Sequence, residues 1–374
     1  TTWFGTVRYW RQYMREVSAK PGRRRRGFHP LDRALGLVSD RLSFNVLSAA
    51  VCLATKLSFA EARTTLAMFV PNAPSTEVIE QSLLGFGRHT ADWFEQAPPP
   101  DRDGPDGEVL IVGVDGKGAP TATETELKRR RRKRRKGRPS GSKRHRGRER
   151  RRRYPKKPRR KKGDKSKNAR VATLVLMYTL RREGDRLVGP LNVWTYASFA
   201  PKEHAFAVAR REARKRGFAP EDCGPDAGKL VQFLSDGDND LARLASKYLP
   251  HARQTIDCIH VVERLWKAGG CLHAEGSDEL ETWVNAQKTR LYAGRAHLIV
   301  RDLRERLARV PKTGPGNKGR RERLEENIGY LDKRIEQMNY RELIEQDLEI
   351  STGAIEGAVK NVIGKRCDHG GMRW

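Results

Sequence analysis

Cysteines and long apolar runs are scarce in this chain of 374 residues. The five cysteines are scattered and odd in number, so no disulfide framework is implied and a reducing, cytoplasmic location is the simpler expectation. The longest apolar run, residues 171–180, is too short to cross a bilayer as a helix. No signal peptide is visible, but the sequence begins at Thr1 without a methionine, so the completeness of the chain stays open.

Acidic residues are nearly absent from one segment, which carries most of the net charge of +30. Residues 128–170 hold 27 lysines and arginines against two acids, Glu149 and Asp164. With so little apolar content the segment cannot fold alone, and we expect residues 127–169 to be a disordered insertion. Its charge predicts salt-sensitive binding to a polyanion, most often nucleic acid. Tyr154 is its only aromatic residue, so base stacking is not the expected mode. The bland alternative is a solvated, nonspecific tail.

Changes in composition predict six parts along the chain. They are a basic N-terminal arm (1–35), a helical region (36–98), a linker rich in Pro, Gly and Asp (99–107), an α/β core (108–271), a helical insertion (272–345), and a final helix and tail (346–374). The core reads strand–strand–strand–helix–strand–helix–strand, which predicts a mixed five-stranded sheet with helices on its faces, in the α/β (α+β) class. The expected strands are 108–116, 170–180, 191–200, 228–238 and 252–260, and the expected helices are 201–217, ending at Gly217, and 239–249.

The helical region has clear start signals. Ser58 precedes Glu61 by three residues, which is a capping box, and Ser75 is a plausible N-cap of the next helix. Two amphipathic helices joined by a short turn in a basic protein suggest a helix-turn-helix DNA reader, with an ordinary helical hairpin as the alternative. The expected apolar faces are Ala62, Leu66 and Phe69 in the first helix and Val78, Ile79 and Leu83 in the second.

Three acidic residues are each flanked by apolar residues in the sequence. Asp115 is expected at the end of the first strand and Asp236 at the end of the fourth. If those strands are neighbours about 4.8 Å apart, their carboxylates can share one cation. Glu356 lies near the start of the last helix, beside a buried stripe of Ile355, Val359 and Ile363. Helix or turn capping is the competing interpretation, most of all for Asp236, which closely precedes a predicted helix.

Carboxylates at strand ends suit Mg²⁺ or Mn²⁺. Two such ions can activate a water or a 3′-hydroxyl and stabilise the leaving oxygen of a phosphodiester. Cysteine and histidine fit zinc less well, because Cys258, Cys271 and Cys367 stand in Cys-x-His patterns that are tighter than usual, so core packing is favoured for the cysteines. The stretch "GVDGKG" lacks the spacing of a Walker motif, which excludes that mode of nucleotide binding.

Three stretches together resemble a known family: "VGVDGKG", "LSDGDNDLARLASKYLPHARQTIDCIHVVERLW" and "GAIEGAVKNVIGKRCDHGGMRW". They are similar to the bacterial insertion-sequence DDE transposases of the Kra group, distant relatives of the Mutator-like elements. The resemblance covers residues 105–374, and the helical N-terminal part more weakly. It implies an RNase H-like catalytic domain with a helical insertion between the second and third acids. The long basic insertion departs from the family.

By this resemblance, Asp115, Asp236 and Glu356 are the metal-binding catalytic acids, holding two Mg²⁺ or Mn²⁺ ions. Asp257 and His260 match the family's Asp-x-x-His, and support of the active site, a structural pair and a DNA contact all stay open for them. Arg366, Met372 and Trp374 match its ending, where Trp374 stacks on an unpaired base or packs in a core.

The implied reaction is metal-dependent cleavage and strand transfer at the ends of an insertion sequence, with double-stranded DNA as partner, at least two subunits and a place at the bacterial nucleoid. The residues expected to contact DNA are Lys117, Arg129, Arg132, Arg135, Arg151, Lys156, Lys360, Lys365, Arg366 and Trp374. Two alternatives remain: an RNase H-like nuclease that cuts without joining, and an inactive transposase-derived protein that binds nucleic acid.

Overall fold

The computed structural model describes residues 8, 10–15, 27–35, 42–90, 92–93, 104–121, 169–224 and 226–367. They fall in two compact units, the described residues of Thr1–Pro100 with Lys365–Cys367 and those of Asp101–Gly364. The predicted disordered insertion therefore lies outside the described residues, apart from the first residue of a strand at 169. Within the described ranges, every helix is too short or too polar to cross a membrane.

The first unit is built around three helices, α2 (Phe44–Ala54), α3 (Phe59–Ala67) and α4 (Thr76–Gly87), which share a buried apolar cluster. Shorter elements precede them: β1 (Met14–Arg15) pairs antiparallel with β2 (Gly27–Phe28), and α1 spans Pro30–Ala34. The capping box at Ser58 and the cap at Ser75 are confirmed.

Two residues of the predicted apolar faces in this unit are exposed. Phe69 is 65 % exposed because α3 ends at Ala67, so the apolar stripe stops before Phe69. Val78 is exposed while its neighbour Ile79 is fully buried, since adjacent helical residues point about 100° apart. The narrower buried face of α4 leaves more of this helix open to solvent than the sequence indicates.

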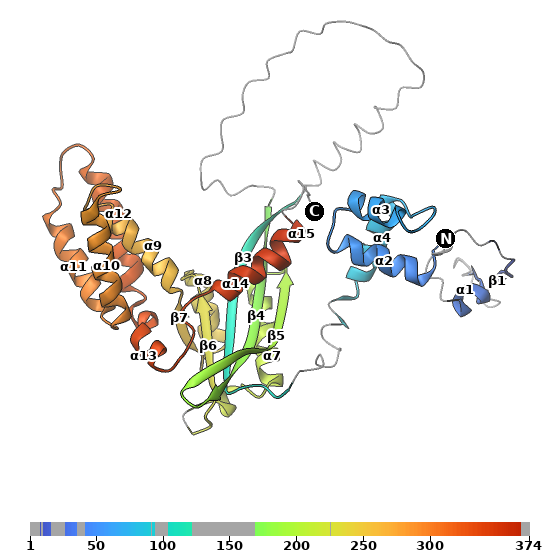
Figure 1. The fold of residues 1–374 in the computed structure, drawn as a ribbon, viewed down its shortest axis with the longest axis horizontal. Helices are drawn as coiled ribbons and strands as arrows, with labels where there is room; N and C mark the ends of the chain where they lie inside the picture. The colour runs from blue at the N-terminus through green and yellow to red at the C-terminus, as the bar shows by residue number, and fades with distance from the viewer. Residues whose placement is uncertain are drawn as a thin grey trace, which may run out of the picture. The chain divides into compact units, whose positions relative to one another are not determined.

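The second unit contains the predicted mixed sheet of five strands (Figure 1). The strands are β3 (Val109–Pro120), β4 (Ala169–Glu183), β5 (Arg186–Ser198), β6 (Leu230–Ser235) and β7 (Arg253–Ile256). Their spatial order is β5-β4-β3-β6-β7. The pairs β5–β4 and β4–β3 are antiparallel, whereas β3–β6 and β6–β7 are parallel. The predicted order of elements and the mixed α/β architecture are confirmed.

Helices cover both faces of this sheet. On one face, α7 (Lys202–Lys215) and α8 (Asn239–Tyr248) pack on alternate residues of β3 in one apolar core that includes Leu110, Val112 and Val114. Gly113 lies between two of these residues and faces the other side. There it contacts Ile355 of α14 (Gly353–Val359), which lies across β3 and β4 (Figure 1).

The predicted helical insertion is also present, as a bundle beside β7 (Figure 1). It comprises α9 (Cys258–Gly269), α10 (Asp278–Tyr292), α11 (Ala296–Arg309), α12 (Asn317–Asp332), η2 (Ile335–Met338) and α13 (Tyr340–Glu345). The bundle begins at Cys258, earlier than expected, because α9 packs on α10 and α12. The prediction that Cys258 belongs to the fifth strand is wrong: the Asp257 carboxylate accepts the Ile259 N–H and starts a helix there.

Candidate active site

The first two predicted acids lie side by side because their strands are neighbours. The parallel pairing of β3 and β6 ends at Gly113 opposite Leu234. Asp115 and Asp236 each follow two residues later, so they leave the pairing at the same level of the sheet. The prediction that Asp115 ends its strand is wrong, because the antiparallel ladder with β4 carries β3 on to Pro120. Asp236 directly follows β6, as predicted.

Helix capping, the interpretation that competes with metal binding for Asp236, applies instead to Asp238. Asp238 is the N-cap of α8, accepts the Asp240 N–H at 2.9 Å and pairs with Lys202 at 2.7 Å. Asp236 accepts the Asp238 N–H through Oδ1 at 3.0 Å, which forms a tight turn between strand and helix. Gly237 in this turn has φ 86°, a conformation that favours glycine. Asp238 therefore caps α8, whereas Asp236 belongs to the turn that precedes this helix.

Glu356 reaches the same place through a close contact between α14 and the sheet. A Cβ at Gly113 would lie 2.0 Å from Ile355 Cδ1, so only glycine lets the helix come this near to β3. Ile355, Val359 and Ile363 are buried, which confirms the predicted stripe, and Glu356 stands beside them near the helix start. After Val359 the helix widens into the π-turn η3 (Lys360–Gly364) before α15 (Lys365–Cys367).

The three acids line one pocket of about 160 Å³. Its lining residues, all within the described part of the chain, are Val114, Asp115, Asp236, His260, Thr352, Ile355 and Glu356, with no lysine or arginine among them. Burial raises the pKa of Asp115, and the negative charges of Asp236 and Glu356 raise it further, while the Gly116 N–H and His260 oppose the shift. Three carboxyl groups thus share a small, partly buried space whose described lining includes no lysine or arginine.

His260 is held at the edge of this pocket by Asp257, the residue after β7. Asp257 is fully buried, and its Oδ2 lies 3.1 Å from Nδ1 of His260 and accepts a hydrogen bond from Thr352 Oγ1. Its other oxygen accepts the Ile259 N–H at 2.8 Å. With Nδ1 engaged in this way, the imidazole lines the pocket. The predicted pair is therefore a buried orienting carboxylate and a histidine that reaches the acids.

The helical bundle supports the Asp236 turn with residues that the sequence does not single out. Tyr330 of α12 donates its hydroxyl hydrogen to the Asp236 carbonyl at 3.0 Å. Arg334 donates two hydrogen bonds to the Gly237 carbonyl and one to Asn239 Oδ1. The Tyr330 ring has the guanidinium of Arg334 4.1 Å from its centroid and that of Arg264 at 4.2 Å. No spacing in the sequence links positions nearly a hundred residues apart, so no pattern could have found this contact.

The predicted DNA-contacting residues are only partly described. Lys117 follows Asp115 by two residues on the same face of β3, with its Nζ beside Gly364 of η3. Lys360 and Lys365 are exposed, and Arg366 has its guanidinium 5.9 Å from the Phe59 ring centroid. The others, Arg129, Arg132, Arg135, Arg151, Lys156 and Trp374, lie outside the described residues, as does Met372.

The cysteines do not share one environment. Cys258 and Cys271 are buried, which fits the predicted core packing, whereas Cys367, for which the same packing was expected, is only half-buried. Cys52 is exposed on α2, whose buried residues are Val46, Leu47, Ala50 and Ala54. In the described part of the chain, the one group of three potential metal ligands with mutually close atoms is Asp257, His260 and Glu356, without a cysteine.

Sequence comparisons add no relative to this geometry. The sequence matches no protein-family model, and no curated protein matches it significantly. The function therefore has to be argued from the pocket.

The donor set of the pocket fits a hard divalent cation. Carboxylate oxygens are the ligands that Mg²⁺ and Mn²⁺ prefer, and a cation would offset the burial that chiefly raises the pKa of Asp115 and the repulsion from Asp236 and Glu356 that adds to it. Asp257 is a poorer ligand than its place beside His260 and Glu356 suggests, because both its oxygens already accept hydrogen bonds. Asp115, Asp236 and Glu356 line the pocket, whereas the ligand atoms that lie within 4.8 Å of one another among the described residues belong to Asp257, His260 and Glu356.

Proposed function

We propose that this chain is a DDE transposase with an RNase H-like core, which cleaves and joins DNA at the ends of an insertion sequence. The observation that carries the proposal is the pocket in which Asp115, Asp236 and Glu356 meet from two neighbouring strands and a helix more than a hundred residues further along. The sequence resemblance assigns the catalytic role to these same three residues.

The architecture supports this proposal. A helical bundle stands in the chain between the second and third acids, as the resemblance requires. The mixed sheet carries the first two acids at one level, where they can act on the same phosphodiester. The three-helix unit, α2 to α4, is the candidate reader of the transposon ends, in keeping with the helix-turn-helix prediction.

Each residue of the site has a distinct proposed role. Asp115, Asp236 and Glu356 would hold Mg²⁺ or Mn²⁺, which when bound would activate a water or 3′-hydroxyl and stabilise the leaving oxygen. Asp257 fixes the ring of His260, which reaches the pocket beside the reacting phosphate. Lys117 and Lys360, near the pocket on β3 and η3, attract the DNA backbone.

Two other functions use the same geometry. A nuclease of the same fold would need the same acids and would leave cut ends unjoined. A transposase remnant would bind nucleic acid through the basic segment and react with nothing. Neither is favoured by a feature of its own, since the three acids are all present and gathered in one pocket.

The decisive experiment is strand transfer with DNA that flanks the gene of this element, in Mg²⁺ or Mn²⁺. The wild type is compared with Asp236→Asn, and with Asp238→Asn as the matched control in the same turn. We expect joined products from the wild type and the control and none from Asp236→Asn. Cut but unjoined DNA would indicate the nuclease, and unreacted DNA with all three proteins would indicate the remnant.

A further inference from the structure

A basic groove lies on the opposite side of the sheet from the three acids, on the outer side of α7. It is a groove of about 350 Å³ lined by His204, Ala207, Val208, Arg210, Arg211, Arg214 and Tyr248. Helix α7 packs on the face of β3 that carries Val112 and Val114, whereas the acids lie on the side of Gly113 and Ile355. This groove is therefore separate from the candidate active site.

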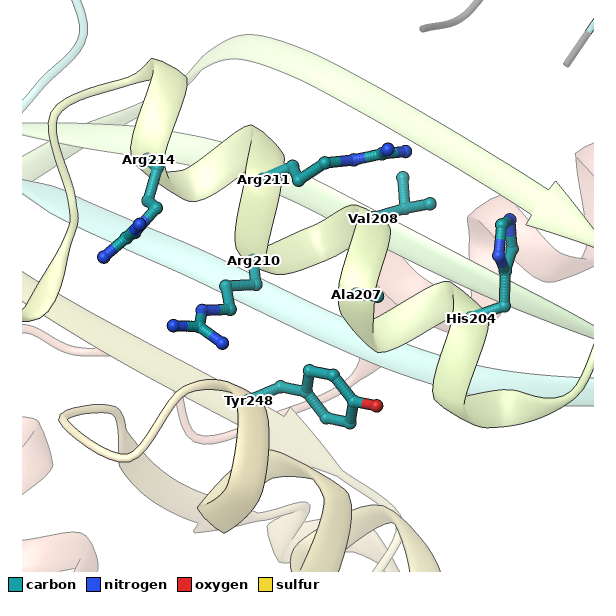
Figure 2. A pocket seen from close by; sticks show the side chains of 7 residues that line it. All are labelled: His204, Ala207, Val208, Arg210, Arg211, Arg214 and Tyr248. Atoms are coloured by element: carbon teal, nitrogen blue, oxygen red, sulfur yellow. The ribbon is translucent and has the colours of Figure 1, made fainter. Parts of the chain in front are cut away.

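The charge of the groove points to an anionic ligand. Arg210, Arg211 and Arg214 are exposed, and none of the described residues that line the groove is an acid. Figure 2 shows that Arg210 and Arg214 extend towards α8, whereas Arg211 extends along the other side of α7. Arg214 lies 3.6 Å from the carboxylate of the exposed Glu221. Such a pair at the surface contributes little, so a phosphate can displace it.

The rest of the lining is apolar and includes an aromatic ring. Ala207 and Val208 form part of the surface between the arginines, and the half-buried ring of Tyr248 faces Arg210 across the groove (Figure 2). Lys247 adds another cation, with Nζ 5.2 Å from the centroid of the Tyr248 ring. Arginines and an aromatic ring in one groove suit a single nucleic-acid strand, with phosphates on the cations and a base against the ring.

We propose that this groove, named here the α7 groove, binds a segment of single-stranded DNA. The Tyr248 ring packs against Phe206 with one part and is exposed in the groove with another. Duplex DNA keeps its base faces stacked inside the helix, so it would use the arginines and make no contact with this exposed part of the ring. A strand with unpaired bases uses both. The choice of DNA as the polyanion rests on the proposed function, because an opened end at the active site would leave a displaced strand to hold.

The test measures binding by the full chain, with fluorescent oligo(dT) as the probe and an unlabelled duplex as competitor. The triple variant R210A/R211A/R214A should reduce the slope of log affinity against log salt by about 2, from ~0.7 per lost phosphate contact on a single strand. The matched control is R301A/R304A/R309A, which removes three exposed arginines from α11. It should keep the wild-type slope, which separates the α7 groove from the general effect of net charge.

Tyr248→Leu keeps an apolar side chain and removes the ring. We expect it to weaken oligo(dT) binding about tenfold and to leave duplex binding unchanged. Oligo(dT) that carries iodo-deoxyuridine should also form a photocrosslink to the peptide that contains Tyr248. Unchanged thermal unfolding would show that the variants are folded.

Equal salt slopes for the two triple variants, or crosslinks confined to the basic segment 128–170, would overturn the proposal. A duplex that competes as well as oligo(dT) at the α7 groove would overturn its preference for single strands. These outcomes are independent of the proposed function, whose failure would appear as the absence of joined products from the wild type.

Discussion

The Tyr330 hydroxyl donates its hydrogen to the backbone carbonyl of Asp236 at 3.0 Å, which ties the helical bundle to the second candidate acid. The same turn is held by Arg334, which donates to the Gly237 carbonyl. A Cβ at Gly237 would lie 2.4 Å from the Tyr330 hydroxyl, so the glycine also makes room for this contact. An insertion that could have been a remote addition to the sheet therefore shapes the turn that carries Asp236.

Tyr330→Phe should weaken metal binding without unfolding the protein. The change removes one hydrogen bond to the turn, for which a net cost of about 1 kcal/mol is typical. We expect the half-saturating Mg²⁺ concentration for cleavage to rise about fivefold, with recovery of the rate at high Mg²⁺. Tyr196→Phe, which removes a tyrosine hydrogen bond to His204 away from the acids, is the control and should leave the metal dependence unchanged. Equal effects of both variants would contradict this role of Tyr330.

Gly113→Ala should separate Glu356 from the other acids. The new methyl group would overlap Ile355 and push α14 away from β3, at a cost of about 1–3 kcal/mol for overpacking. We expect a large loss of cleavage and a smaller loss of stability. A plasmid-nicking assay measures the first, and thermal unfolding measures the second. The double variant Gly113→Ala with Ile355→Ala removes the overlap and should recover part of the activity. Additive losses in this double-mutant cycle would show that the contact does not position Glu356.

Asp115→Asn should stabilise the metal-free protein at neutral pH. The pKa of Asp115 is raised in the folded state, chiefly by burial, so the ionised carboxylate disfavours folding. A raised folded pKa gives stability that is fully present below the unfolded pKa and is lost as the pH rises through the folded pKa. The variant and the wild type should thus have similar melting temperatures in acid. The variant should melt higher once the pH exceeds the folded pKa of Asp115. A lower melting temperature for the variant at neutral pH would contradict the conclusion that the ionised Asp115 carboxylate destabilises the metal-free fold.

Asp257→Asn should damage both the fold and the pocket. Asp257 is fully buried and accepts hydrogen bonds from Ile259, Thr352 and His260, and an amide offers one accepting oxygen in place of two. An unsatisfied buried group costs about 1–3 kcal/mol, so chemical denaturation should show a loss of that size. Asp238→Asn, at an exposed helix cap, should cost less. A loss no larger than that of Asp238→Asn would contradict the role of Asp257 as the buried anchor of His260.

The local sequence patterns predicted much of this fold. Alternating or continuous apolar runs indicated the five strands, and the capping box at Ser58 and the cap at Ser75 placed two helix starts, because these signals act over a few residues. The errors arose where a partner distant in the sequence decides the outcome. The ladder with β4 extends β3 beyond Asp115, and the Asp257 cap turns the chain into a helix at Cys258.

The sequence was enough to predict which residues belong to the candidate site, but not the contacts that bring them together. Asp115, Asp236 and Glu356 stood out because each interrupts an apolar pattern, and the structure brings all three to one pocket. The contacts that place them, Ile355 on Gly113 and Tyr330 on the Asp236 turn, join segments that lie far apart in the chain. Such contacts leave no periodic trace in a single sequence.

Mn²⁺ binding, measured by calorimetry on the wild type and on single variants of the three acids, tests the central claim most directly. We predict two strong sites per chain in the wild type and in Asp238→Asn, and their loss in Asp115→Asn, Asp236→Asn and Glu356→Gln. Because binding adds stability only to the folded state, Mn²⁺ at about 100 times its dissociation constant should stabilise the wild type by about 2.7 kcal/mol for each bound ion, and these three variants by much less. Equal Mn²⁺ binding by all five proteins would show that the three acids do not form a metal site, and the proposed catalytic mechanism would fail with it.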